Sequence, residues 1–309
     1  MNIITITLNP AVDLHLSSEA LIPGSHNTAK LIRRDSAGKG INVSRALLAN
    51  GITSHAVVFL GKERYDDYLL PLTSLGMKVL PILVDGKVRE NVNIQVGDKE
   101  TVIATDGPSV NAEEVRLAED AILPLIGIDT YAVLSGSIPK GSDKDAILSM
   151  LYEIKSRGAK LIIDSRSLSI EEIIALHPHV IKPNGEEAEA LTGITVKSVD
   201  DGVRAAEAVR EMGCENVMLT LGASGAVLAS KEGVYVAKAP SVEVLSSVGA
   251  GDSTIAGYLA SMALGETVSD NLRRAIAFGS AACMAEGSLP PSPSNVASLL
   301  SKIQVRQVN

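Results

Sequence analysis

The chain has 309 residues, of which 46% are hydrophobic and 21% charged, a balance typical of a globular protein with a sizeable core. Its 28 Lys and Arg against 36 Asp and Glu give a net charge of −8, which argues against nucleic acid or an anionic membrane surface as the main partner. No basic leader or long apolar run is present, and the cysteines Cys214 and Cys283 lie far apart, so we expect a cytoplasmic protein with two buried thiols.

The first third of the sequence predicts strands of two kinds. Residues 3–8 form a β-branched run that predicts a buried strand, and the turn at 9–13 leaves Asp13 just beyond its end. Residues 14–35 alternate patchily and predict short strands outside the main sheet. Residues 88–96 alternate strictly, and a turn at Gly97-Asp98 joins them to a strand near 101–104, which predicts a hairpin with one wet face. We expect these outlying segments to share a small sheet.

The remaining elements alternate between strand and helix. This order predicts a mostly parallel sheet covered on both faces, and no repeat or linker interrupts it, so we expect a single domain over 1–309. A glycine turn leads into a helix within 36–48, and another helix follows Gly251. The other expected helices lie near 64–75, 111–123, 143–157, 184–192, 199–212, 268–286 and 294–303, and the expected strands at 55–60, 79–84, 131–134, 160–164, 180–182, 217–221, 226–229 and 234–239.

A glycine turn late in the chain is the most distinctive local pattern. Gly249-Ala250-Gly251-Asp252 precedes apolar residues at helical spacing, which predicts a tight turn into a helix. The unpaired N–H groups and the dipole at such a helix start favour anions. Asp252 is either part of an anion site or simply an N-cap, and these residues alone leave both readings open.

Polar residues follow several expected strands, where ligands of doubly wound sheets bind. They are Asp13, Ser135-Gly136-Ser137, Asp164-Ser165, Lys182-Pro183-Asn184 and the 221–225 segment. Each alone is more often a turn than a site. The chain has neither the Gly-x-x-x-x-Gly-Lys-Ser/Thr loop nor a Gly-x-Gly-x-x-Gly after the first strand, so a P-loop and a dinucleotide fold are both excluded.

Three motifs together resemble the signatures of the ribokinase-like (PfkB) carbohydrate kinases. They are Gly38-Lys39-Gly40-Ile41-Asn42-Val43, Lys182-Pro183-Asn184-Gly185-Glu186-Glu187 and Val248-Gly249-Ala250-Gly251-Asp252-Ser253. They stand in family order across nearly the whole chain. The resemblance implies a three-layer α/β/α core with a mostly parallel sheet, and a small β-sheet lid formed by about 14–35 and 88–105.

The start of the chain and Lys39 are similar to the phosphosugar branch, which includes 1-phosphofructokinase and tagatose-6-phosphate kinase. The resemblance implies that Asp252 is the catalytic base and that the backbone at Gly249, Ala250 and Gly251 stabilises the transferred phosphoryl group. A second implied set binds the substrate, with Arg89 and Lys39 near its phosphate: Asp13, Gly38, Lys39, Asn42, Arg89, Asn91 and Ser137. A guanidinium matches phosphate oxygens well, although an edge-strand arginine can also be a solvated charge.

The resemblance also implies ATP as phosphoryl donor and Mg²⁺ as cofactor. Glu187 and Asn184 would reach the metal through water, although Glu187 could simply be a favourable charge in the first turn of a helix. The implied nucleotide-binding residues are Lys182, Asn184, Thr220, Gly222, Ser224, Gly225, Ser247, Val248 and Ser280.

Three functional hypotheses follow. The first is phosphorylation of fructose 1-phosphate to fructose 1,6-bisphosphate, and the second is a kinase of tagatose 6-phosphate or fructose 6-phosphate. The third is an inactive sugar-phosphate sensor, against which the intact signature residues argue. Glu90 departs from the small or neutral residue of the family, but strand alternation should turn it away from Arg89. The resemblance further implies a homodimer through the lid.

Overall fold

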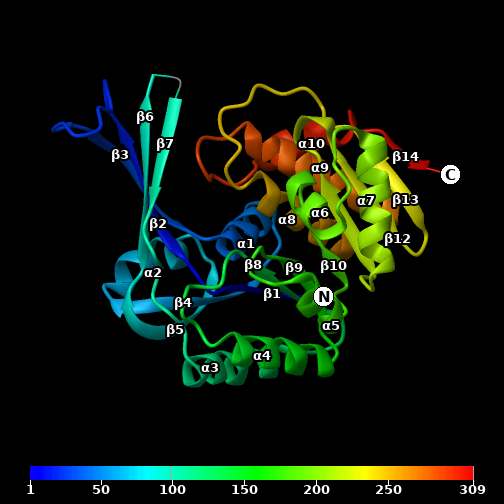
Figure 1. Cartoon of the computed structure of the whole chain (residues 1–309), viewed down its shortest axis with the longest axis horizontal. Coiled ribbons are helices and arrows are strands. Elements are labelled where there is room, and N and C mark those ends of the chain that lie inside the picture. The colour runs from blue at the N-terminus through cyan, green and yellow to red at the C-terminus, as the bar shows by residue number, and fades with distance from the viewer. Residues whose placement is uncertain (98, 309) are drawn as a thin grey trace.

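The strand at the start of the chain lies inside a large sheet in the computed structural model, which describes residues 1–97 and 99–308 (Figure 1). Within these residues the sheet has ten strands in the order β14-β13-β12-β11-β10-β9-β8-β1-β4-β5. Seven are parallel: β5 (Lys78–Lys87), β4 (His55–Glu63), β1 (Asn2–Thr7), β8 (Thr130–Ser135), β9 (Lys160–Asp164), β10 (Val180–Ile181) and β11 (Asn216–Thr220). Three antiparallel strands extend one edge: β12 (Ala226–Ser230), β13 (Gly233–Ala237) and β14 (Val305–Val308).

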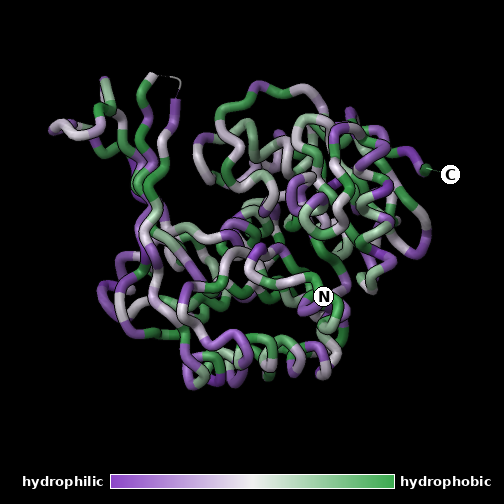
Figure 2. The backbone as a smooth tube through the Cα atoms, in the orientation of Figure 1, coloured by the Kyte–Doolittle hydropathy of each residue, from purple (hydrophilic) through white to green (hydrophobic). Residues whose placement is uncertain are grey.

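Helices cover both faces of this sheet, as the alternating pattern predicts. Successive side chains of a strand point to opposite faces, so Ile3 and Ile4 belong to different hydrophobic clusters. One face packs against α3 (Ala112–Ile122), α4 (Lys144–Ser156), α5 (Ile170–Leu176), α6 (Gly185–Thr192) and α7 (Val199–Glu211). The other packs against α1 (Lys39–Ala49), α8 (Ala250–Leu264), α9 (Val268–Cys283) and α10 (Pro293–Leu300). Figure 2 shows hydrophobic and hydrophilic residues alternating along α3 and α4, as expected of helices with one buried side.

A small second sheet stands away from the large one, which confirms the predicted separate sheet (Figure 1). Its order is β3-β2-β6-β7, with β2 (Ala11–Ser17) antiparallel to β3 (Lys30–Ala37) and parallel to β6 (Arg89–Val96), and with β7 (Lys99–Ala104) at the edge. Because β2 begins at Ala11, Asp13 lies within a strand, and its expected position beyond a strand end is wrong. The predicted turn includes Asp98, which lies outside the described residues.

Helix α2 (Tyr65–Ser74) joins the small sheet to the core through one buried tyrosine. The Tyr68 hydroxyl donates to the Ala37 carbonyl over 2.7 Å, and the Ser36 hydroxyl donates to the Tyr68 carbonyl over 2.7 Å. Both hydrogen bonds are buried, where a polar group without a partner is costly. These bonds fix the end of β3 just before Gly38, where the first signature motif begins.

Two elements were not predicted, and two predicted helices ran too long. Helix α5 is only seven residues long, so its helical periodicity is barely expressed, and β14 is a short strand at the sheet edge. The short 3₁₀ turns η1 (Leu123–Leu125) and η2 (Gly222–Ser224) complete the elements. Helix α9 ends at Cys283 rather than near 286, and α10 ends at Leu300 rather than near 303. Cys283 is only partly buried, unlike Cys214. None of the helices in the described ranges is both long and apolar enough to span a membrane.

Candidate active site

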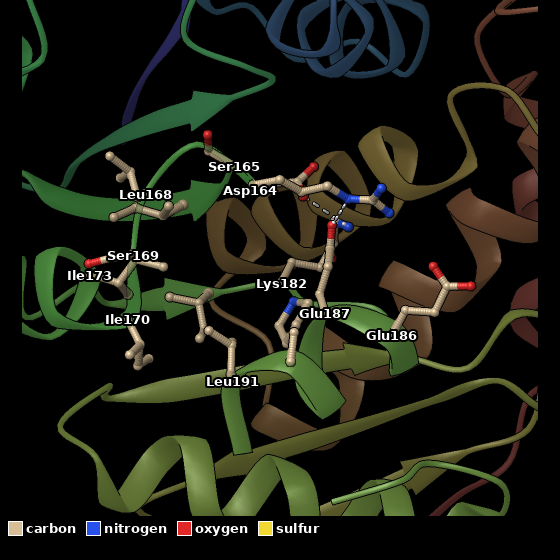
Figure 3. A pocket seen from close by; sticks show the side chains of 15 residues that line it. Asp164, Ser165, Leu168, Ser169, Ile170, Ile173, Lys182, Glu186, Glu187 and Leu191 are labelled. Atoms are coloured by element: carbon tan, nitrogen blue, oxygen red, sulfur yellow. Dashed lines mark hydrogen bonds and ion pairs between the residues drawn. The ribbon is translucent and has the colours of Figure 1, made fainter. Parts of the chain in front are cut away.

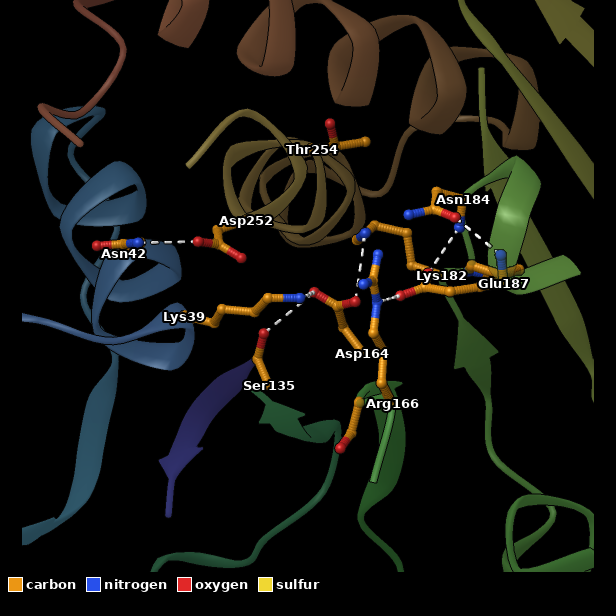
Figure 4. A network of polar contacts seen from close by, with 12 residues as sticks. Lys39, Asn42, Ser135, Asp164, Arg166, Lys182, Asn184, Glu187, Asp252 and Thr254 are labelled. Carbon is orange, nitrogen blue, oxygen red and sulfur yellow. Dashed lines mark hydrogen bonds and ion pairs between the residues drawn. The ribbon is translucent and has the colours of Figure 1, made fainter. Parts of the chain in front are cut away.

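A buried carboxylate at the carboxyl end of β9 lies at the centre of the site. Asp164 is 4% exposed and pairs with two lysines: its Oδ1 lies 3.3 Å from the Lys182 amine, and its Oδ2 lies 3.4 Å from the Lys39 amine (Figure 4). The Ser135 hydroxyl donates to the same Oδ2 over 3.3 Å. Sequence reasoning placed Asp164 at this edge without giving it a role, and its pairing joins the first and second signature motifs.

Asp252 lies in the first turn of α8 and does not cap the helix. The N-cap is Gly249, whose φ of 77° suits a residue without a side chain, and among the described residues no side chain accepts a hydrogen bond there. Instead the Asn42 amide donates to Asp252 Oδ2 over 2.9 Å (Figure 4). The N-cap reading of Asp252 is therefore wrong, and its carboxylate faces α1.

The environment of Asp252 favours its protonated form. Burial, with the negative charge of Asp164 nearby, raises its pKa to about 6. The hydrogen bond from Asn42 and the charges of Lys39 and Lys182 act in the opposite direction. A carboxylate with a pKa near neutrality is suited to accepting a proton in this setting.

The start of α8 presents backbone donors beside a lysine. A Cβ atom on Gly251 would lie 3.2 Å from the Lys182 amine, so the glycine leaves the amine close to the helix backbone. The first N–H groups of a helix have no partner within it and carry partial positive charge. Helix starts of this kind favour anions, and the buried Lys182 adds a positive charge beside this one.

Some of the predicted substrate residues lie on the small sheet or next to it, whereas Lys39 and Asn42 contact Asp164 and Asp252. The Asn91 amide donates to the Asp13 carboxylate over 2.7 Å. Burial raises the pKa of Asp13 above its ordinary value, and this hydrogen bond acts in the opposite direction. The amide of Asn9 donates to the Ser137 hydroxyl over 2.9 Å. A Cβ on Gly107 would contact both the Asn9 amide oxygen and the Arg89 side chain, so these residues are close together. Sequence reasoning missed Asn9 as a site residue.

Several buried polar atoms in this region have no partner within residues 1–97 and 99–308. They are Asn9 Oδ1, Asn42 Oδ1, Arg89 Nε and Asn91 Oδ1. Buried polar groups without a partner are uncommon, because each costs about 1–3 kcal/mol. Their clustering indicates a site for a polar ligand. Glu90 is exposed, but it lines the same polar cavity as Arg89, so the expectation that strand alternation separates the two side chains is not confirmed.

A charged cluster on β2 and β3 was not anticipated. Arg33 Nε and His15 Nε2 lie 2.7 and 3.2 Å from Asp35 Oδ2. Although burial opposes it, the hydrogen bond with His15 and the charge of Arg33 hold the pKa of Asp35 below its ordinary value. A Cβ on Gly287 would contact both Arg33 and His15, so the small sheet touches the turn between α9 and α10 here.

The second signature motif forms a capping box at the start of α6. The Glu187 N–H donates to the Asn184 side chain over 2.9 Å, and the Asn184 N–H donates to Glu187 Oε2 over 2.8 Å. The other oxygen of Glu187 forms an ion pair with Arg166 Nε. Sequence reasoning did not include Arg166, which stands in the loop after β9.

The other predicted nucleotide residues are spread over three elements. Thr220 ends β11 and its hydroxyl donates to the Pro183 carbonyl over 3.4 Å, and Gly222 and Ser224 form η2. Gly225 has φ 102° and packs against the backbone of β13, where no side chain fits. Ser247 and Val248 lie in the loop before α8, and Ser280 is buried in α9.

Two cavities adjoin these residues. One, of about 380 Å³, lies between α5 and α6, with Leu168, Ile173 and Leu191 in its walls and with Arg166 and Glu187 at its polar side (Figure 3). The other, of about 400 Å³, is polar and includes Arg89 among its lining residues. Within the described part of the chain, no group of three or more His, Cys, Asp or Glu side chains is arranged to hold a metal ion.

The chain matches the family described as pfkB family carbohydrate kinase over residues 3–295. It therefore belongs to this family and is a phosphotransferase of the carbohydrate kinase class. The resemblance inferred from the three motifs and the expected ribokinase-like α/β fold are both confirmed.

Its relatives cover the full length of the chain. 1-Phosphofructokinase of Escherichia coli (strain K12) is 32% identical over 307 residues, which is 99% of this chain and 98% of that protein. Tagatose-6-phosphate kinase of Staphylococcus epidermidis is 29% identical over 280 residues, 90% of each chain. The structure of phosphofructokinase-2 from Escherichia coli in complex with substrates and products matches with a TM-score of 0.90 and 25% identity, covering 98% of this chain and 99% of that chain.

Replacing Asn42 by Ala should raise the pKa of Asp252 above about 6, because the hydrogen bond that favours its ionised form is lost. Titration of the carboxyl carbon by NMR measures this directly. Asn91→Ala is the matched control: it should leave the Asp252 titration unchanged and raise the pKa of Asp13 instead. A titration of Asp252 that does not respond to Asn42→Ala would contradict the assigned contact.

Proposed function

We propose that this chain transfers the terminal phosphoryl group of ATP to fructose 1-phosphate, giving fructose 1,6-bisphosphate and ADP. The observation that carries the proposal is the buried Asp252, with its raised pKa, in the first turn of α8 beside Lys182. The names of the relatives, 1-phosphofructokinase above all, support this choice of substrate.

Asp252 acts as the general base in this proposal. The attacking hydroxyl of the sugar lies within hydrogen-bond reach of its carboxylate and gives up its proton as the new O–P bond forms. Asn42 holds the carboxylate in place through its 2.9 Å hydrogen bond. Asp164 keeps its own negative charge paired with Lys39 and Lys182, so that Asp252 is the carboxylate left to take the proton.

The start of α8 stabilises the group in transfer. The backbone at Gly249, Ala250 and Gly251 faces the developing negative charge, and Lys182 adds a full positive charge beside it. Phosphoryl transfer requires positioning and charge neutralisation more than covalent chemistry. The backbone donors and Lys182 meet the requirement for charge neutralisation. Electrostatic stabilisation of this kind is strongest where water is excluded.

The sugar phosphate is held between the core and the small sheet. Asp13, Gly38 and Asn42 bind its hydroxyl groups, while Arg89 and Lys39 bind its phosphate, with Asn91 and Ser137 close by. The unpartnered Arg89 Nε, Asn91 Oδ1 and Asn42 Oδ1 support this assignment, because a bound sugar phosphate provides the partners that they lack. In this role the small sheet is a lid that limits hydrolysis of ATP by water.

ATP occupies the edge of the large sheet next to α8, in contact with the residues predicted from the family: Lys182, Asn184, Thr220, Gly222, Ser224, Gly225, Ser247, Val248 and Ser280. When bound, Mg²⁺ supplies positive charge to the phosphate oxygens. The residues fit a hydrated ion, because both oxygens of Glu187 already accept hydrogen bonds and a contact through water keeps them. Asn184 and Glu187 would hold this water shell.

We further propose a homodimer formed through the lid, in the cytoplasm. The small sheet exposes Leu31, Ile32, Val102 and Ile103, each more than half exposed, and a partner sheet would cover them. The two free cysteines agree with a reducing compartment.

A kinase of tagatose 6-phosphate or fructose 6-phosphate is the second candidate, supported by the relative named tagatose-6-phosphate kinase. A coupled assay of ADP release over fructose 1-phosphate, fructose 6-phosphate and tagatose 6-phosphate separates the two. The highest kcat/KM with fructose 1-phosphate supports the proposal. A higher kcat/KM with another sugar phosphate would make that sugar phosphate the proposed substrate instead. ADP release with none of them would favour a binding protein without activity.

Asp252→Asn should lower kcat by about 10²–10⁴-fold and leave ADP binding within about twofold, because the amide cannot accept the proton. In the wild type, kcat should fall as the pH drops through about 6, where the carboxylate becomes protonated. Steady-state kinetics between pH 5 and 9 and calorimetric ADP titration measure both effects. The control is Asp145→Asn, an exposed carboxylate in the first turn of α4. Near-normal turnover of Asp252→Asn would falsify its role as base.

Arg89→Ala should raise KM for the sugar phosphate by about tenfold or more, because the charged hydrogen bonds to the phosphate are lost. A loss of about 1.4 kcal/mol in binding free energy corresponds to a factor of ten. KM for ATP should change little. Lys30→Ala is the control on the same sheet, because Lys30 is an exposed cation at the start of β3. Equal increases in KM for the sugar phosphate and for ATP would contradict the assignment of Arg89 to the sugar phosphate.

A further inference from the structure

Arg166 occupies a position at the site that none of the three signature motifs includes. It stands two residues after Asp164, in the loop between β9 and α5, and its side chain crosses to α6. Figure 4 shows its guanidinium group between the Asp164–Lys182 pair and Glu187. These four side chains also line one cavity together, which confirms that they are neighbours (Figure 3).

The described residues engage only part of this guanidinium. Its Nε forms the ion pair with Glu187 Oε1, whereas the two Nη groups have no protein partner within 1–97 and 99–308. The side chain is 65% exposed. An arginine has five N–H donors in a fixed plane, so an anchored Nε leaves four donors pointing in a defined direction.

The charges around Arg166 explain why a cation is needed there. Glu186 and Glu187 both lie in the first turn of α6, and Asp164 and Asp252 lie across the site. A polyphosphate that approaches these four carboxylates is repelled unless cations balance them. Lys39 and Lys182 are already paired with Asp164, so Arg166 balances Glu187.

We propose that Arg166 is a phosphate-binding residue of the nucleotide site. Glu187 orients its guanidinium through Nε, and the Nη groups donate to the phosphate chain of the nucleotide as a planar pair. This inference rests on the proposed function, since it takes ATP to be the phosphoryl donor. It assigns to Glu187 the additional task of orienting Arg166.

The alternative role for Arg166, masking of Glu187, predicts a change in nucleotide affinity of the opposite sign. If Arg166 only masks Glu187, it keeps the carboxylate away from a hydrated Mg²⁺, and its removal would strengthen binding of the magnesium nucleotide. If Arg166 binds phosphate, its removal weakens nucleotide binding with and without the metal. The sign of the change therefore decides between the two roles.

The test is calorimetric titration of the full-length protein with ADP, in MgCl₂ and in EDTA. Arg166→Gln should weaken ADP binding about tenfold in both conditions, with KM for the sugar phosphate unchanged within about twofold. Arg166→Lys should recover part of the loss, because it restores the charge without the planar pair. Arg116→Gln on α3 is the matched control: Arg116 is also 65% exposed and also pairs with one carboxylate, Asp120.

Unchanged or tighter ADP binding by Arg166→Gln would overturn the assignment. This failure is distinct from failure of the proposed function, in which the wild type itself would bind no ADP or phosphorylate no sugar phosphate. Circular dichroism melting of Arg166→Gln checks that the capping box of α6 still forms. A binding loss that persists with an unchanged melting temperature supports direct contact.

Discussion

The shared pairing of Asp164 with Lys39 and Lys182 is the interaction on which the rest of the site depends. One buried carboxylate pairs with two ammonium groups, one from the start of α1 and one from the end of β10, and the buried ammonium of Lys182 would be costly without this partner. The pairing brings the start of α1, the end of β9 and the end of β10 to one point. It also places Lys182 against the backbone of Gly251, at the start of α8. The Asp164 charge adds to burial in raising the pKa of Asp252, while the two lysines act against it.

The two sheets divide the proposed chemistry between them. The edge of the large sheet carries the charged groups proposed for the transferred phosphoryl group, and these groups are mostly paired with one another. The small sheet and the neighbouring loops carry polar atoms that remain without partners, such as Asn91 Oδ1 and Arg89 Nε. Such atoms are stabilised only when a ligand is bound. Under the proposed function, the groups that contact the transferred phosphoryl group are preorganised, and the side that binds the sugar is completed by the substrate.

Much of the fold followed from local patterns, because each element expresses its own periodicity. The strict alternation of residues 88–96 identified a half-exposed strand apart from the main sheet, and the structure confirms this. Local patterns failed where tertiary contacts decide the outcome. Helix α5 is too short to show a period, and Asp13 belongs to a strand because β2 pairs with both β3 and β6. Asp252 could have capped its own helix, but Asn42, 210 residues earlier in the chain, takes its carboxylate instead.

The sequence by itself determined the family, the α/β class and the three motifs, since these depend on residue types at fixed local spacing. Only the tertiary structure decided which of those residues touch. Asn9 reaches Ser137 across 128 residues, Lys39 reaches Asp164 across 125, and Arg166 reaches Glu187 from a neighbouring loop. Distances of this kind depend on the register of the sheet and on the packing of helices, to which the whole chain contributes. The raised pKa of Asp252 has the same origin, because burial and the charge of Asp164 are properties of the folded molecule.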